Sequence, residues 1–314
     1  MLARHLNEVV AAARAILATH AISFPGLPSA TLAAALNLTA AVHDLAKATS
    51  HFQAYLRNEP YIPALKPHSL LSACYAFHRA QAIPDLPWDD VIPGLIACAV
   101  AGHHGEYPGF PALALAIKRG ITTLHRQIDA LDPAVFALTP GGVSLGPGFT
   151  HEDLDRVARA VADLARSYPR RPPDEKIRHR ILGLFLISVL LEADRTVLAL
   201  GRLPDDPPLP LPVAAVADHI TTLPVYDTEI GRIRGECLAQ AAHTDHSPPI
   251  QTLTLPTGTG KTLTALHLAL ALRDRAAGTP PKIVVAMPYL SVIEQTDEVY
   301  QAVLHDQIAT EGDR

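Results

Sequence analysis

The stretch from residue 41 to residue 56, AVHDLAKATSHFQAYL, constrains the fold of this chain more than any other segment. Its apolar residues recur at helical spacing and predict a helix packed into a core: Val42, Leu45, Phe52 and Leu56. His43 and Asp44 sit side by side in this apolar pattern, and Lys47 follows one turn later, where its ammonium could hold an anion. A buried ionised carboxylate needs a partner, and a metal ion would also use the adjacent imidazole. Taken alone, the doublet fits a helix end satisfied by backbone groups at least as well.

Other histidines stand in apolar helical surroundings where exposure to solvent does not explain them. His5 shares the inward face of an alanine-rich amphipathic helix predicted over residues 5–18. His68 stands at the first turn of a later helix, and His103 and His104 end an apolar one. Each of them alone is also compatible with a helix cap, a core histidine or a polar helix terminus.

A second carboxylate of interest follows the longest apolar run of the chain. The run from Ile181 to Leu191 is apolar or small, and Glu192, Asp194 and Arg195 come directly after it. An acid placed so deeply predicts either a metal ligand or a charge paired with Arg195.

Charge and apolar content limit the class of protein. The net charge of −5 gives no overall basic field, so any binding of nucleic acid has to come from local basic patches or bound metal. The longest apolar run is too short to span a bilayer, and the three cysteines are far apart in the sequence. We therefore expect a cytoplasmic protein with no membrane partner.

Seven side chains would form a metal site if the fold brought them together: His5, His43, Asp44, His68, His103, His104 and Asp194. Five imidazoles and two carboxylates can ligate two divalent ions, with Asp44 bridging them, and leave positions open for water and a phosphate oxygen. Such a pair of ions hydrolyses phosphodiesters. The histidine-rich set favours Mn, Fe, Co or Ni over Mg.

The pattern changes after residue 200. Proline density over residues 201–212 indicates a linker, and a helix resumes at residues 226–243. The sequence IQTLTLPTGTGKT at 250–262 then predicts a strand running into a phosphate-binding loop, followed by a helix and a second strand, KIVVAMPYL at 282–290.

The phosphate-binding loop has a defined set of candidate residues: Thr257, Gly258, Thr259, Gly260, Lys261 and Thr262. Its backbone N–H groups can cradle phosphates, Lys261 can reach the terminal ones, and Thr262 can hold the Mg²⁺ of ATP. Because the chain stops at Arg314, soon after the second predicted strand, we do not expect it to hydrolyse ATP by itself.

In their order along the chain, these motifs resemble the HD-domain superfamily and, within it, the type I CRISPR-associated HD nuclease-helicases. The resembling segments are RHLNEV at 4–9, HDLAKATSHFQAYL at 43–56, HS at 68–69, GHHG at 102–105, LLEADR at 190–195, LTLPTGTGKT at 253–262 and VAMPYLSVIEQT at 285–296. The resemblance implies a mainly α fold, an HD-domain helical bundle followed by the partial first α/β RecA-like lobe of a helicase. The implied domains are an HD nuclease domain at 1–205, a linker and helix at 206–248, and a truncated ATP-binding lobe at 249–314.

The resemblance also implies roles for the site residues. His5, His43, Asp44 and Asp194 would surround one metal ion, and His68, His103 and His104 would surround the other with Asp44 shared. Lys47 matches the family's lysine near the scissile phosphate, and with Asp44 it makes up the expected catalytic pair. Ala46 stands where the family more often has glycine.

The function implied by this resemblance is cleavage of single-stranded DNA exposed by a guide-RNA surveillance complex, coupled in the intact protein to a helicase that uses ATP with Mg. Two alternatives stay open. One is an HD phosphohydrolase acting on nucleotides or cyclic oligonucleotides, against which the helicase-like tail argues. The other is a non-catalytic, metal-stabilised docking module.

Overall fold

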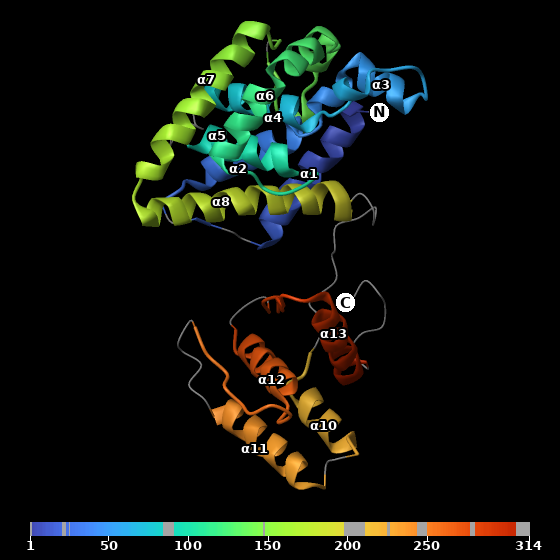
Figure 1. The fold of residues 1–314 in the computed structure, drawn as a ribbon, viewed down its shortest axis with the longest axis vertical. Coiled ribbons are helices and arrows are strands. Elements are labelled where there is room, and N and C mark those ends of the chain that lie inside the picture. Colours follow the sequence, from blue (N-terminus) through green and yellow to red (C-terminus); the bar gives the residue numbers. More distant parts are fainter. Residues whose placement is uncertain are drawn as a thin grey trace. The chain divides into compact units, whose positions relative to one another are not determined.

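The computed structural model divides the chain into two compact units, Met1–Pro204 and Asp205–Arg314, each with its own hydrophobic core (Figure 1). The residues it describes are 2–20, 23–24, 26–83, 91–146, 148–197, 211–224, 227–243, 250–276 and 280–305. Most of the predicted proline-rich linker at 201–212 lies outside the described residues.

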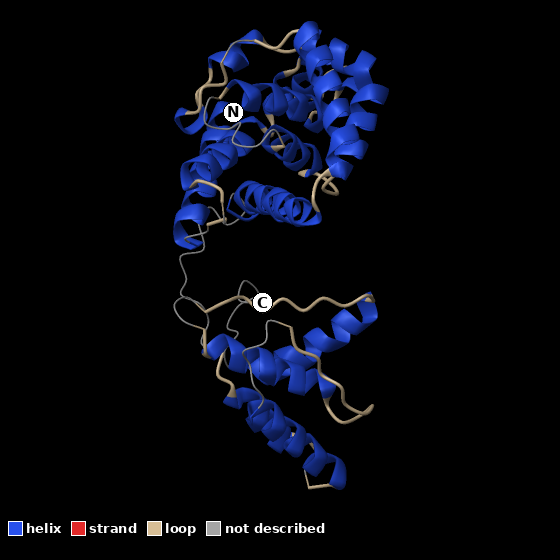
Figure 2. Cartoon of the chain, turned by 90° about the vertical axis from the view of Figure 1, so that its left-hand side faces the viewer, coloured by secondary structure: helices blue, strands red, loops and turns tan. Residues whose placement is uncertain are grey.

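The first unit is a bundle of helices. Its α-helices are α1 (Leu2–His20), α2 (Ser29–Val42), α3 (Ser50–Leu56), α4 (Ser69–Ala82), α5 (Ile92–Gly102), α6 (Phe110–Asp129), α7 (His151–Ser167) and α8 (Pro173–Leu191). Short 3-10 turns lie between them: η1 (Leu45–Ala48), η2 (Pro63–Leu65), η3 (Pro133–Ala137), η4 (Pro140–Gly142) and η5 (Tyr168–Arg170). Among the described residues, Figure 2 shows helices and loops with no strand, so the mainly α fold class is confirmed.

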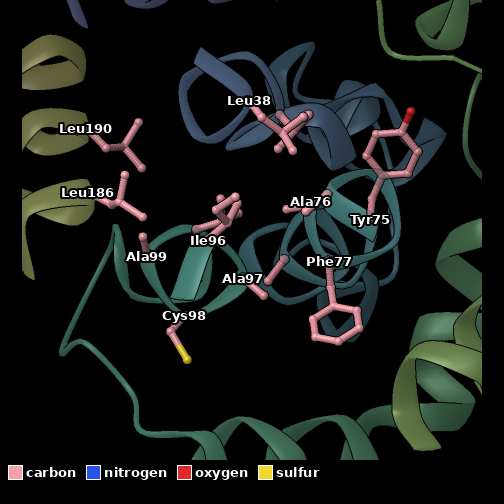
Figure 3. Packing of buried hydrophobic residues seen from close by; sticks show 14 of the residues in the cluster. Leu38, Tyr75, Ala76, Phe77, Ile96, Ala97, Cys98, Ala99, Leu186 and Leu190 are labelled. Carbon is pink, nitrogen blue, oxygen red and sulfur yellow. The ribbon is translucent and has the colours of Figure 1, made fainter. Parts of the chain in front are cut away.

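Helix α5 lies in the middle of this bundle. Every residue of α5 except Ala101 is buried, as expected for a helix that is apolar on all sides. Figure 3 shows the α5 side chains facing residues of α2, α4 and α8 across the core: Leu38, Ala76, Phe77, Leu186 and Leu190. Because α5 ends at Gly102, its packing carries His103 into the interior, while His104, the next residue, is exposed.

The segment around the His43-Asp44 doublet differs from the single helix that its periodicity predicts. Helix α2 ends at Val42, the turn η1 follows, and α3 begins at Ser50. Thr49 has extended backbone angles, φ −68° and ψ 143°, and its side-chain oxygen accepts a hydrogen bond from the N–H of Phe52. This cap starts a new helix, which apolar spacing alone does not reveal because both helices keep their apolar residues on the core side.

The last helix of the first unit also ends irregularly. After α8, residues Glu192–Val197 form a π-helical turn, η6. A π-turn inserts an extra residue per turn and is often found at functional sites. It displaces Asp194 from the direction that a continued α-helix would give it.

The contact between η4 and α1 should contribute to the stability of the first unit, and Gly141 provides a test. Gly141 has φ +56°, its N–H donates a 2.7 Å hydrogen bond to Asn7, and an added Cβ would overlap the buried Val10. We expect Gly141→Ala to lower the free energy of unfolding by about 2–4 kcal/mol, from the left-handed backbone and the overlap together. Urea unfolding followed by circular dichroism measures the loss.

The neighbouring Gly142 is a matched control for that substitution. Its φ is +80°, but an added Cβ there meets nothing within 4 Å. Gly142→Ala should therefore carry only the backbone cost, about 1–2 kcal/mol. Equal losses in the two variants would mean that the packing of η4 on α1 does not depend on the missing Cβ.

The second unit contains α10 (Ala214–Thr222), α11 (Glu229–His243), α12 (Lys261–Asp274) and α13 (Leu290–Leu304). Its small core is formed mainly by leucines and valines of α10, α11, α12 and α13. The helices predicted after the linker and after the phosphate-binding loop are present. No described helix of either unit has both the length and the apolar character needed to cross a membrane.

The two strands predicted for the second unit are not formed, which corrects the α/β detail of its fold. Residues 251–255 and 281–287 are described and run as irregular chain without strand pairing. Ile250 and Val284, at or within these segments, are 83% and 86% exposed. A strand needs a neighbour to satisfy its backbone hydrogen bonds, and a buried parallel strand also needs cover on both faces, so an apolar run alone does not produce one.

Candidate metal centre

The His43-Asp44 doublet lies at the point where α2 ends, inside the bundle. His43 is 0% exposed and Asp44 is 1% exposed. The Nδ1 of His43 is 2.8 Å from the carbonyl oxygen of Ala40 in the last turn of α2, so Nδ1–H donates there. This hydrogen bond leaves Nε2 of the neutral ring as an acceptor, and Nε2 is the atom that lies toward the two carboxylates: 3.3 Å from Asp44 Oδ2 and 3.6 Å from Asp194 Oδ1.

Four residues gather on the α1 side of Asp44: His5, His43, Asp44 and Asp194. One ligand atom from each lies within 4.8 Å of all the others. Nε2 of His5 is 3.0 Å from Asp44 Oδ2 and 3.4 Å from Asp194 Oδ1. The elements α1, α2 and η6 therefore bring together residues that are up to 189 positions apart in sequence, from residue 5 to residue 194.

A second group of four gathers on the other oxygen of the same carboxylate: Asp44, His68, His103 and His104. Nε2 of His68 lies 2.9 Å from Asp44 Oδ1, and Nε2 of His103 lies 3.5 Å from it. The Nε2 atoms of His68 and His104 are 3.0 Å apart. His68 precedes α4 and the other two follow α5, so the most extensive helix contact of the unit, between α4 and α5, sets this group.

The donor atoms of both groups suit a cation. Nδ1–H of His103 donates to the carbonyl oxygen of Val100 at 2.5 Å, so its Nε2 is also an acceptor in the neutral ring. Among the described residues, Asp44 Oδ1 and His103 Nε2 are buried without an aligned hydrogen-bond partner, although His68 Nε2 is only 2.9 Å from that oxygen. Lone pairs crowded in this way repel one another unless a proton or a metal ion lies between them. The residues present fit a pair of divalent ions that share Asp44.

The ionisation of these groups follows from burial and mutual contact. Burial alone would lower the pKa of His43, but its contacts with Asp194 and Asp44 raise that pKa to about 9. Burial would raise the pKa of Asp44, yet the four imidazoles that face it hold this pKa well below its usual range. Burial, with the neighbouring His103 and His68, lowers the pKa of His104 to about 4. Burial and the contacts among these groups thus favour an ionised Asp44 at the centre, which suits a cation.

Two supporting contacts were not foreseen from the sequence. Arg195 donates a 2.6 Å hydrogen bond to the carbonyl oxygen of His103. This partner differs from the Asp194 carboxylate that the sequence suggested for Arg195. Ser72 accepts a 3.0 Å hydrogen bond from the N–H of Ala46 and so holds the turn after the doublet. These contacts span 92 and 26 residues, and no local pattern indicates such pairs.

Lys47 lies beside the centre as the sequence predicted. Its Nζ is 2.5 Å from Asp44 Oδ2, and its side chain is 26% exposed. Because the ammonium reaches both the carboxylate and solvent, it can contact an anion that approaches the two groups.

The loop that the sequence predicts to bind phosphate is followed by the helix it predicts, α12. Gly258 and Gly260 have φ +86° and +89°, and α12 begins at Lys261. Nζ of Lys261 donates to the carbonyl oxygens of Leu255 and Pro256, 2.9 Å and 3.3 Å away. The remaining loop residues lie together before or at the start of that helix: Thr257, Thr259 and Thr262. A helix N-terminus preceded by a glycine-rich turn can receive phosphate.

Comparison with known proteins gives three findings. Residues 1–188 match the family model described as "Cas3, HD domain", and residues 236–313 match "Type III restriction enzyme, res subunit". The chain is 28% identical over 303 residues to the CRISPR-associated nuclease/helicase Cas3 of Haloferax volcanii, an alignment that covers 85% of this chain. It spans only 32% of that relative's length. No solved structure matches the chain.

Proposed function

The chain belongs to the Cas3 HD-domain family, whose model covers residues 1–188 of 314, and on this basis we propose that its first unit hydrolyses phosphodiester bonds of single-stranded DNA with two divalent metal ions. The observation that carries the proposal is the pair of ligand groups that share Asp44. The first unit corresponds to a nuclease domain over residues 1–205. Residues 206–248 would connect it to an ATP-binding segment at 249–314.

Each of the two ligand groups would bind one ion. His5, His43, Asp44 and Asp194 would hold one ion, and Asp44, His68, His103 and His104 would hold the other. A bound pair of divalent cations supplies Lewis acidity and a nucleophile available at neutral pH. Because imidazole nitrogens outnumber carboxylates, Mn, Fe, Co or Ni should bind better than Mg.

The surrounding side chains orient the ligands and the substrate. The carbonyl oxygens of Ala40 and Val100 fix which nitrogen of His43 and of His103 faces the centre. Lys47 would bind a non-bridging oxygen of the scissile phosphate, since its ammonium lies next to Asp44 and is partly open to solvent. The two carbonyl oxygens would thus orient the metal ligands, and Lys47 would orient the phosphodiester.

The family and the relative's name support the proposed substrate and partner. The relative in Haloferax volcanii is a CRISPR-associated nuclease/helicase, and its longer chain joins both activities. We infer that this protein likewise acts in the cytoplasm on single-stranded DNA that a guide-RNA surveillance complex exposes, with ATP and Mg used by the helicase part of the longer protein.

A substrate comparison tests this function. The purified chain, stripped of metal with EDTA and reloaded with Mn²⁺, should cleave single-stranded DNA and should lose that activity when EDTA is added again. Cyclic mononucleotides and cyclic oligonucleotides, offered at the same concentration, should be turned over far more slowly. Faster turnover of the cyclic compounds would favour the HD phosphohydrolase alternative, and no metal-dependent turnover of any of them would favour a docking module.

Nucleotide binding by the second unit has its own test. Replacing Lys261 by alanine removes the ammonium that lies beside the loop, so ATP with Mg should bind roughly tenfold to hundredfold more weakly, the value of a charge-assisted hydrogen bond. Titration calorimetry of the full chain measures this change. Lys282→Ala, which removes an exposed lysine outside the loop, is the control and should leave the affinity unchanged. Equal affinities in the two variants would rule out this loop as the nucleotide site.

A further inference from the structure

A cavity of about 710 Å³ opens beside the metal centre in the first unit. His5 and Lys47 are part of its wall and also belong to the centre or touch it, so the cavity and the centre are continuous. Eight of its thirteen lining residues are apolar. Leu56 of α3, one of the lining residues, is 54% exposed.

The cavity has a cation, Lys47, beside the metal centre, further charged groups at Arg57 and Asp132, and an apolar remainder that makes up most of its lining. Lys47 stands at the metal side, with its Nζ 2.5 Å from Asp44 and 5.7 Å from the centre of the Phe52 ring. Phe52 and Val135 are 7% and 4% exposed, so both are fixed by packing and present a rigid wall. Leu138, after η3, completes the wall opposite α3.

This arrangement fits a nucleotide better than a bare phosphate. A phosphate held between the metal centre and Lys47 would have an apolar cavity beside it, where a flat heterocycle can be buried against Phe52 and the aliphatic side chains. Apolar and stacking contacts accept any base, because every base has an aromatic face. A sugar that carries no base cannot make these apolar and stacking contacts.

We propose that this cavity holds a nucleobase adjacent to the scissile phosphate and that its apolar wall, including Leu56 and Leu138, distinguishes base-bearing from abasic DNA. The proposal rests on the phosphodiesterase function proposed for the same centre. It adds a binding subsite that makes the cleavage tolerant of sequence but sensitive to the presence of a base.

The test compares two ligands that share a phosphate and differ in the base. Thymidine 5′-phosphate and 2-deoxyribose 5-phosphate are monoesters, so a phosphodiesterase does not consume them, and titration calorimetry of the Mn²⁺-loaded full chain measures both affinities at equilibrium. We expect the thymidine compound to bind roughly tenfold more tightly and with a more negative heat-capacity change, because its base buries apolar surface.

Substitutions in the cavity wall test whether the difference in affinity between the two monoesters arises in the cavity. Leu138→Trp places an indole in the part of the cavity proposed for the base and should reduce the affinity ratio toward one. Leu56→Ala removes apolar wall from an exposed position, where misfolding is not expected, and should reduce the ratio by roughly threefold. Leu115→Trp places the same indole on an exposed part of α6 outside the cavity and is the matched control, with the ratio retained.

The outcomes separate this proposal from the function on which it rests. Metal-dependent hydrolysis of bis(p-nitrophenyl) phosphate, a diester without bases, reports on the centre alone. If the wild-type chain hydrolyses this diester but binds the two monoesters equally, or if Leu56→Ala keeps the full ratio, the base subsite is wrong and the phosphodiesterase stands. If the diester is not hydrolysed, the proposed function fails, and the base subsite fails with it.

Discussion

Replacing Asp44 by asparagine should lower the rate of DNA cleavage by at least roughly a thousandfold, because the change removes several kcal/mol of transition-state stabilisation by the metal ions. Asp44 is the one residue that belongs to both ligand groups, and it is 1% exposed. Asparagine keeps the shape of the side chain but removes the negative charge that faces four imidazoles. Cleavage of a labelled single-stranded oligonucleotide measures the rate, and elemental analysis of the loaded chain should show both ions lost or weakly held.

Asp153 provides the control for this substitution. It is also a buried carboxylate, 7% exposed, but it caps α7 by accepting hydrogen bonds from Thr150 and lies outside both ligand groups. Asp153→Asn should cost about 1 kcal/mol of stability, the value of a helix cap, and should keep the metal content and the cleavage rate. An Asp44→Asn chain that folds, binds two ions and cuts DNA at the wild-type rate would remove Asp44 from the centre.

Metal loading should also raise the melting temperature of the first unit markedly. A ligand that binds only the folded state at a thousand times its Kd stabilises that state by about 4 kcal/mol per site, and about 2–4 °C accompanies each kcal/mol in a domain of this size. We therefore expect Mn²⁺ to raise the transition by roughly 8–16 °C for each tightly held ion. The physical reason is that a cation would be shared by Asp44 Oδ1 and His103 Nε2, which are buried among the described residues without an aligned hydrogen bond and lie 3.5 Å apart.

Scanning calorimetry of the EDTA-treated and reloaded chain measures this shift. The Asp44→Asn variant should show little of it, and the Asp153→Asn variant should show all of it. Mg²⁺ at the same concentration should give a smaller rise than Mn²⁺, Co²⁺ or Ni²⁺, since the ligand set is rich in imidazole. Equal rises with Mg²⁺ and Ni²⁺ would contradict the preference for transition metals, and no rise with any ion would contradict the centre.

The two errors in the expected secondary structure have a common cause. The apolar spacing over residues 41–56 predicted one helix, but Thr49 caps a second helix at Ser50. The apolar runs before and after the phosphate-binding loop predicted strands, but the described residues of both are irregular. In both cases apolar spacing reports which side chains are suited to burial, while breaks and strand pairing depend on hydrogen bonds made by the backbone.

Some properties of this protein were determined by the sequence alone. Individual helices followed from the helical spacing of apolar residues, and the resemblance implied the helical bundle; seven consecutive residues, PTGTGKT, predicted the glycine-rich turn before α12, whose glycines have positive φ. The seven candidate ligands could be named because histidines and acids in apolar helices are unusual and because their order resembles a known family. Each of these signals is local, since it depends on neighbours within a few turns.

Only the tertiary structure decided that the candidates meet. The packing of α4 on α5 brings His68 to His104, and the π-turn after α8 brings Asp194 to His5 on α1. The contact of Arg195 with His103 and the apolar cavity between α3 and η3 likewise have no counterpart in any short segment. Their physical basis is the same: buried donors and apolar walls are completed by residues up to 189 positions away, and chain folding, not local sequence, sets those distances.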